Sequence, residues 1–124
     1  MAGTIPRVNS ADFKKRTQEY ALRILKLVES LPKDDASRIL GRQLLRSGTS
    51  VGANYRAATR GRSRADFIAK LGIVEEECDE SIYWIELLIA AGKVKGIRVQ
   101  ALLDESQEIL AMVIASINTA RSRR

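Results

Sequence analysis

The feature that most constrains the fold is one long stretch, RQLLRSGTSVGANYRAATRGRSRADF, at residues 42–67. At about 100° per residue it predicts the end of a long helix, a tight break at Gly61 and the start of another helix. Apolar residues gather within roughly 60° on one side of the first helix: Leu40, Leu44, Val51, Tyr55 and Ala58. Arginines gather within roughly 80° on the nearly opposite side: Arg38, Arg42, Arg46, Arg56 and Arg60. This helix therefore has a core face and a basic face.

Three glycines form a further strip beside the apolar face: Gly41, Gly48 and Gly52. Glycine inside a helix costs about 1 kcal/mol relative to alanine, so its repetition on one strip needs a reason. We predict that a neighbouring helix backbone comes close at these positions. A fourth strip is small and polar: Gln43, Ser47, Ser50 and Asn54.

The rest of the chain is typical of an all-helical protein. Its 124 residues suffice for one hydrophobic core, and 45% hydrophobic with 29% charged residues is a globular composition. We expect helices at about 10–30, 35–60, 63–91 and 96–120, between a flexible arm at 1–9 and a basic tail at 121–124. Short connections between long helices predict a single domain over residues 1–124, an antiparallel up-down-up-down four-helix bundle.

Local signals mark the helix ends. Ser10 is the expected N-cap of the first helix, and Asp34 or its neighbour caps the second. Ser63, with Asp66 three residues later, predicts the start of the third helix. Gly92 stands where a left-handed residue would end that helix.

No segment indicates a membrane or a secreted location. The longest apolar run, residues 82–91, is interrupted by Glu86 and is too short to span a bilayer. The N-terminus lacks the apolar run of a signal peptide, and a single cysteine fits a reducing compartment. We expect a cytoplasmic protein without membrane partners.

The residue types do not favour an enzyme. The chain has no histidine, so it has no imidazole base and no histidine metal ligand. A di-iron bundle site would need Glu-x-x-His pairs, so we interpret the carboxylates of the third helix as an acidic strip: Glu75, Glu76, Glu77, Asp79, Glu80 and Glu86. Cys78 lies in the predicted core stripe and is interpreted as a small buried hydrophobe. We expect no catalytic residue, no metal and no cofactor.

Charge is distributed unevenly along the chain. Residues 1–64 carry 14 Lys and Arg against 5 Asp and Glu, whereas residues 65–124 carry 7 against 10. Arginine binds phosphate bidentately, so the arginines predict contact with RNA or DNA through phosphates. The candidate residues are Arg38, Arg42, Arg46, Arg56, Arg60, Arg62 and Arg64. Two alternatives remain open: a solvated helix face, or a protein-interaction scaffold whose arginines pair with acidic residues of a protein partner or a neighbouring subunit.

The third helix has a second apolar stripe roughly opposite its core stripe. The stripe includes Ile73, Tyr83, Trp84 and Leu87. Because each helix of a four-helix bundle keeps an outer face, an apolar outer stripe predicts a subunit interface. We therefore expect a homo-oligomer.

A series of short motifs resembles a known family. They are Leu31-Pro32, Gln43-Leu44-x-Arg46-Ser47, Ser50-Val51-x-Ala53-Asn54, Arg62-Ser63 and Asp66-Phe67. In this order they resemble the 23S rRNA intervening-sequence protein family, bacterial proteins often labelled "four helix bundle protein". The resemblance covers about residues 11–92.

This resemblance implies an antiparallel four-helix bundle that assembles as a ring-like homopentamer. It also implies kinship with the accessory variability determinant of diversity-generating retroelements, a basic pentameric barrel that binds nucleic acid and the reverse transcriptase. The chain departs from many members after Asn54, where Tyr55-Arg56-Ala57-Ala58 replaces the pattern Ile-x-Glu-Gly. This departure indicates a side branch of the family.

Overall fold

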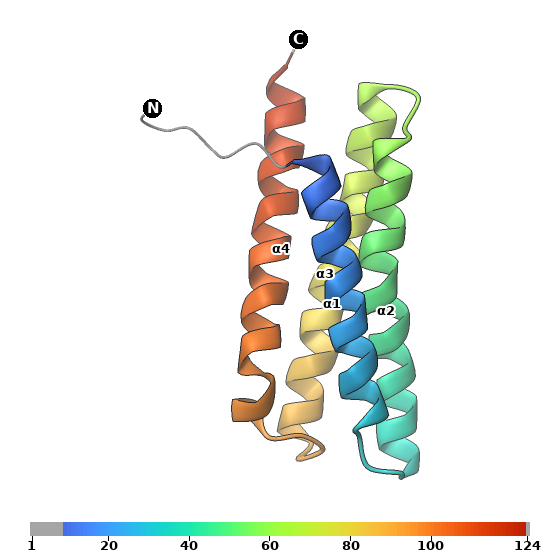
Figure 1. Ribbon diagram of the computed structural model, residues 1–124, viewed down its shortest axis with the longest axis vertical. Helices are drawn as coiled ribbons and strands as arrows, with labels where there is room; N and C mark the ends of the chain where they lie inside the picture. The colour runs from blue at the N-terminus through green and yellow to red at the C-terminus, as the bar shows by residue number, and fades with distance from the viewer. Residues whose placement is uncertain (1–8, 124) are drawn as a thin grey trace.

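The computed structural model describes residues 9–123, and these form four helices in an antiparallel up-down-up-down bundle (Figure 1). This arrangement confirms the predicted all-α fold class. The helices are α1 (Ser10–Glu29), α2 (Asp35–Thr59), α3 (Arg64–Ala90) and α4 (Gly96–Ser122). Residues 1–8 of the predicted arm and residue 124 of the predicted tail lie outside the described residues.

The helices begin at side-chain caps. Asn9, not Ser10, caps α1, because its side-chain oxygen accepts the backbone N–H of Asp12 at 3.2 Å. Asp34 caps α2 by accepting from the Ser37 N–H at 2.9 Å. Ser63 caps α3, as predicted, by accepting from the Asp66 N–H at 3.1 Å.

The C-terminal end of α3 agrees with the prediction, whereas that of α4 differs from it. Gly92 has φ +73°, and it follows α3 as expected. The Lys93 N–H donates to the Leu88 carbonyl and the Gly92 N–H to the Ile89 carbonyl, which is a Schellman motif. α4 continues through Ser122, so it includes two residues of the predicted basic tail, and that boundary was wrong.

One continuous core runs along the bundle axis. Its largest fully buried side chains include Tyr20, Ile24, Leu44, Leu71, Ile85, Leu88 and Ile109. The apolar face predicted for α2 is buried except at Leu40, which is half-buried. Polar groups inside the core are paired: the Tyr20 hydroxyl lies 2.6 Å from the Ser106 hydroxyl. Such pairing offsets the cost of removing these groups from water.

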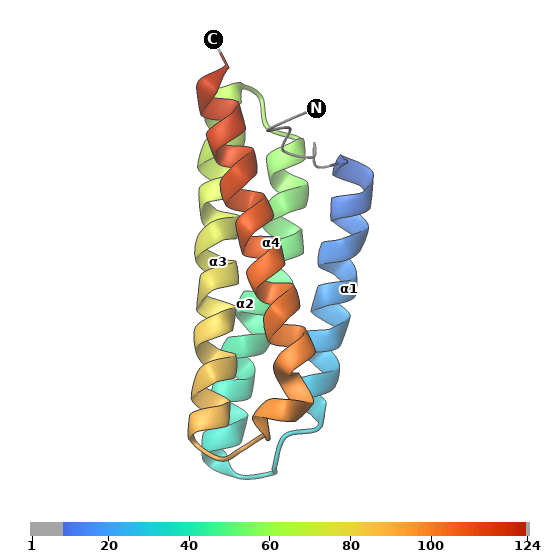
Figure 2. The same cartoon turned by 90° about the vertical axis from the view of Figure 1, so that its left-hand side faces the viewer.

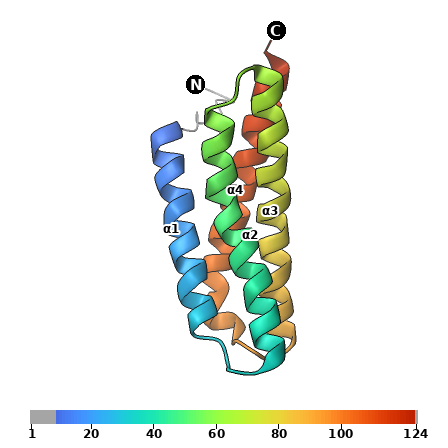
Figure 3. The same ribbon diagram turned by 90° about the vertical axis from the view of Figure 1, so that its right-hand side faces the viewer.

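α2 is central to the layout because it lies between α1 and α3 (Figure 3). α4 packs mainly on α3 and makes a smaller contact with α1 (Figure 2). The α1–α4 seam contains an ion pair between Arg16 and Glu105 at 2.6 Å, and a second, longer one to Glu108 at 3.3 Å. The hydrogen bond between Tyr20 and Ser106 also crosses it.

α1 and α2 approach each other closely where α2 has glycine. A Cβ atom on Gly48 would lie 2.9 Å from two side-chain carbons of Ile24, which is closer than carbon atoms pack. A Cβ on Gly41 would lie 3.2 Å from side chains of α1 and of the turn after it, and one on Gly52 would lie 3.1 Å from the Thr17 hydroxyl oxygen. The glycine strip of α2 therefore faces α1.

Candidate nucleic-acid interface

All seven candidate arginines are exposed. Five lie along α2 and at its C-cap, and Arg62 and Arg64 lie in the turn to α3 and at its first residue. Within residues 9–123, only two of the seven guanidiniums form an ion pair with a carboxylate, whereas Arg62 donates its backbone N–H to the Asp66 carboxylate at 3.1 Å. Arg38 pairs with Asp35 at 2.6 Å on its own helix, and Arg46 pairs with α3. The predicted basic face is thus divided into paired and free cations.

Arg46 lies between two glutamates of α3. Its guanidinium donates to Glu77 at 3.0 Å and to Glu80 at 2.5 Å. Glu80 also accepts a hydrogen bond from the Trp84 indole N–H at 3.2 Å. The hydrogen bond from Arg46 lowers the pKa of the Glu80 carboxyl, and the same bond raises the pKa of Arg46. Arg46 is therefore held within its own chain.

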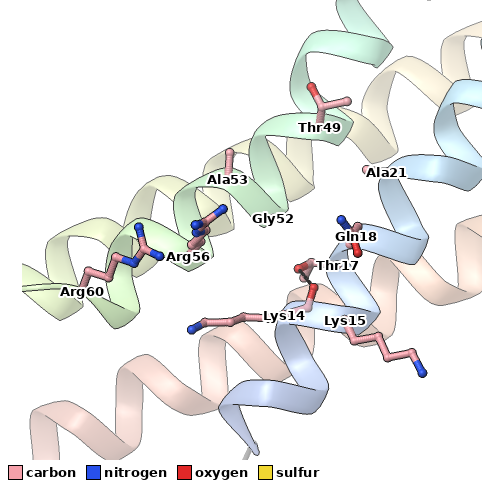
Figure 4. A pocket seen from close by; sticks show the side chains of 10 residues that line it. All are labelled: Lys14, Lys15, Thr17, Gln18, Ala21, Thr49, Gly52, Ala53, Arg56 and Arg60. Carbon is pink, nitrogen blue, oxygen red and sulfur yellow. Dashed lines mark hydrogen bonds between the residues drawn. The ribbon is translucent and has the colours of Figure 1, made fainter.

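The cations at the other end of α2 border a groove of about 510 Å³ against α1 (Figure 4). We call it the α1–α2 groove. Its lining residues are Lys14, Lys15, Thr17, Gln18, Ala21, Thr49, Gly52, Ala53, Arg56 and Arg60. Four of these side chains are cationic and none is a carboxylate, so the groove favours an anion.

Two of the arginines in the groove were singled out from the sequence, whereas Lys14, Lys15 and Gln18 were missed. The available signal was the antiparallel hairpin of the first two helices, which puts the start of α1 beside the end of α2 (Figure 1). Gly52 faces Thr17, so residues one turn away on each helix also come together.

The predicted interface stripe on α3 is only partly open. Tyr83 is 55% exposed and Ile73 is 44% exposed, whereas Trp84 and Leu87 are half-buried. Trp84 packs against the core, and its ring meets Tyr83 edge to face with centroids 5.1 Å apart. The stripe therefore offers two exposed apolar side chains beside two that are half-buried.

Cys78 is fully buried, as its place in the predicted core stripe required. Burial raises the pKa of its thiol to about 12, so it stays protonated at neutral pH. Among the residues described here, no group of three or more Cys, Asp and Glu side chains is arranged to hold a metal ion. Between residues 9 and 123, no helix is long and apolar enough to span a membrane.

These features define a basic, all-helical up-down bundle. The chain belongs to the 23S rRNA-intervening sequence protein family, whose sequence model matches residues 9–115. It is also similar to the crystal structure of a protein of unknown function from the S23 ribosomal protein family of Bacteroides thetaiotaomicron. The two chains are 38% identical with a TM-score of 0.82, and the match covers 88% of this chain and 97% of the other. Comparison with curated protein sequences gives no match.

Proposed function

We propose that this protein is a non-enzymatic adaptor that binds RNA or DNA through the arginines of α2 and the turn that follows it. The observation that carries the proposal is the set of free cations: Arg42, Arg56, Arg60, Arg62 and Arg64. Within residues 9–123, none of these five guanidiniums forms an ion pair with a carboxylate. A face kept only for solubility normally mixes both signs of charge.

Phosphates are the expected point of contact. Arginine matches a phosphate with two parallel N–H donors, and it remains charged at any physiological pH. The α1–α2 groove has no aromatic side chain in its lining, so bases would not stack there. We therefore expect binding that depends on the backbone and on its shape rather than on base sequence.

A homo-oligomer would repeat the cationic face and add weak contacts as avidity. We propose Ile73, Tyr83, Trp84 and Leu87 as the oligomer interface, because Tyr83 and Ile73 leave apolar surface in water. The family resemblance implies a pentamer. Replacing both Ile73 and Tyr83 by Glu should lower the mass measured by light scattering at micromolar concentration. A parent protein that is already monomeric would contradict the assembly.

The test of nucleic-acid binding is a titration with duplex DNA and structured RNA at several salt concentrations. The logarithm of the association constant should fall linearly with the logarithm of salt, with a slope of about −0.9 per phosphate contact on duplex DNA. Several phosphate contacts per oligomer predict a steep slope. A parent protein without affinity at low salt would refute the proposal.

Charge-reversal variants test which face of the protein contacts the nucleic acid. Arg42→Glu combined with Arg56→Glu should weaken binding to all sequences alike. The matched control, Arg23→Glu combined with Arg98→Glu, makes the same charge change at exposed positions on α1 and α4. Mass must be measured alongside, because the scaffold alternative predicts that reversing the α2 arginines dissociates the oligomer or releases an acidic protein partner instead.

A further inference from the structure

The α1–α2 groove combines features that an ordinary exposed helix face lacks. Three of its lining residues are small, Ala21, Gly52 and Ala53, so little side-chain volume fills the space beside them. Its rim has cations from both helices. In Figure 4 the Lys14 side chain extends toward the helix that carries Arg56 and Arg60, while Lys15 extends to the opposite side.

The hydrogen-bond donors of the groove are its four cations and the Gln18 amide, because its two threonine hydroxyls have already used their only hydrogens. The Thr49 hydroxyl donates its hydrogen to the Leu45 carbonyl at 2.7 Å, and the Thr17 hydroxyl donates to the Lys14 carbonyl at 3.0 Å. The remaining polar side chains are four cations and the Gln18 amide. A ligand with several acceptor oxygens and a negative charge matches this set.

The size and lining of the groove further restrict the class of ligand that it could bind. Arg56 and Arg60 are one turn apart, about 6 Å along the helix axis, so they can reach more than one phosphate. A volume of about 510 Å³ exceeds what a lone phosphate fills. The lining has no aromatic or large apolar side chain that could hold a base.

We infer that the α1–α2 groove seats the sugar–phosphate backbone of one nucleic-acid strand, with Lys14, Arg56 and Arg60 on its phosphates. The inference rests on the proposed nucleic-acid binding and assigns it to one place. It adds α1 to the interface and makes the small lining residues necessary for binding. Arg46, already paired with Glu77 and Glu80, lies outside this seat.

A steric variant tests the seat without changing charge. Ala53 is exposed, so Ala53→Phe should fold while its ring fills the groove. We expect about tenfold weaker binding of a structured RNA to the full-length protein, because the ring would keep several phosphates away from the cations at once. Ala111→Phe, at an exposed alanine of α4, is the control and should bind like the parent. Circular dichroism and light scattering confirm that both variants remain folded and assembled.

A charge variant tests the phosphate contacts independently. Lys14→Gln combined with Arg60→Gln should lower the steepness of the salt dependence by about 2, because each cation on a phosphate accounts for about one unit of slope. Lys26→Gln combined with Arg98→Gln removes two exposed cations outside the groove, and its slope should equal the parent slope.

The outcomes separate this inference from the proposed function. If the parent binds RNA and both groove variants behave like their controls, the seat is refuted while nucleic-acid binding stands. If the parent binds no RNA or DNA, the remaining question is whether the groove binds a smaller anion. A titration with inorganic tripolyphosphate answers it, with NMR chemical shifts of the Thr49, Gly52 and Ala53 backbone amides as the readout. Shifts confined to the groove would replace the backbone seat with a small-phosphate site. Absence of shifts would refute any anion site there.

Discussion

The two flanks of α2 both have exposed arginines, but these arginines differ in what they contact. Toward α3, Arg46 is paired with Glu77 and Glu80, and Ser47 accepts a hydrogen bond from Ser81 at 2.8 Å. Toward α1, the helix has glycines, and beyond them Arg56 and Arg60 border a groove without carboxylates. The first flank holds α2 and α3 together through paired side chains. The second leaves the charges of Arg56 and Arg60 available to a ligand.

An arginine face therefore cannot be assigned to a ligand from the sequence of its own helix alone. Arg46 and Arg56 are both exposed arginines of α2. The neighbouring helix supplies two glutamates to one and none to the other.

The largest effect is expected at the close approach to α1. Gly48→Ala should destabilise the fold by about 1–3 kcal/mol, although alanine favours helix, because its Cβ would meet the buried Ile24 at 2.9 Å. Gly72→Ala on α3 is the matched control, since a Cβ there has no neighbour within 4 Å. The control should gain up to about 1 kcal/mol. Urea unfolding measures both, and equal shifts would remove the close-approach argument.

On the α3 flank, the hydrogen bond between two buried serines should contribute about 1 kcal/mol. Ser47→Ala leaves the Ser81 hydroxyl bonded to the Glu77 carbonyl, and Ser81→Ala leaves the Ser47 hydroxyl bonded to the Leu44 carbonyl. Neither variant leaves a buried polar group without a hydrogen-bond partner, so a double-mutant cycle isolates the energy of the hydrogen bond between Ser47 and Ser81. The double variant should lose less stability than the two single variants added; strict additivity would show that the pair is uncoupled.

Replacing one arginine of each flank by glutamine should have opposite effects on stability and on RNA binding. Arg46→Gln should cost roughly 0.2–1 kcal/mol of stability, the range for largely exposed ion pairs, and should change RNA affinity little. Arg56→Gln should leave the unfolding free energy within about 0.5 kcal/mol and weaken RNA binding. If Arg46→Gln weakens binding as much as Arg56→Gln does, the division of the face is wrong.

The smallest effect is a pH dependence confined to the α3 flank. Arg46 lowers the pKa of Glu80 below its usual value of 4.5. A carboxyl with a depressed folded-state pKa adds stability above its unfolded pKa, and this is lost as pH falls through the folded pKa. The stability difference between parent and Arg46→Gln, measured by urea unfolding across a pH series, should therefore shrink below pH 4.5. The difference between parent and Arg56→Gln should not follow this titration, because no carboxylate lines the groove.

Much of the fold could be predicted because its signals are local. A period of 3.6 residues selects the buried positions of each helix, and the caps at Asp34 and Ser63 depend on residues within one turn. Errors came where two local signals compete: Asn9 and Ser10 are both good caps. On α3, the core stripe that contains Cys78 continues by helical spacing through Ile85 to Ile89, yet Ile89 is half-buried and its neighbour Leu88 is fully buried.

The site was less predictable because it depends on contacts between helices. The arginine face of α2 and the glycine strip are properties of one helix, so they follow from the spacing of residues along the chain. Whether Arg46 meets glutamates, whether Lys14 joins Arg56, and how far Trp84 is buried were decided by tertiary structure. The physical reason is that the rotation and axial register of neighbouring helices arise from side chains distant in sequence packing against one another.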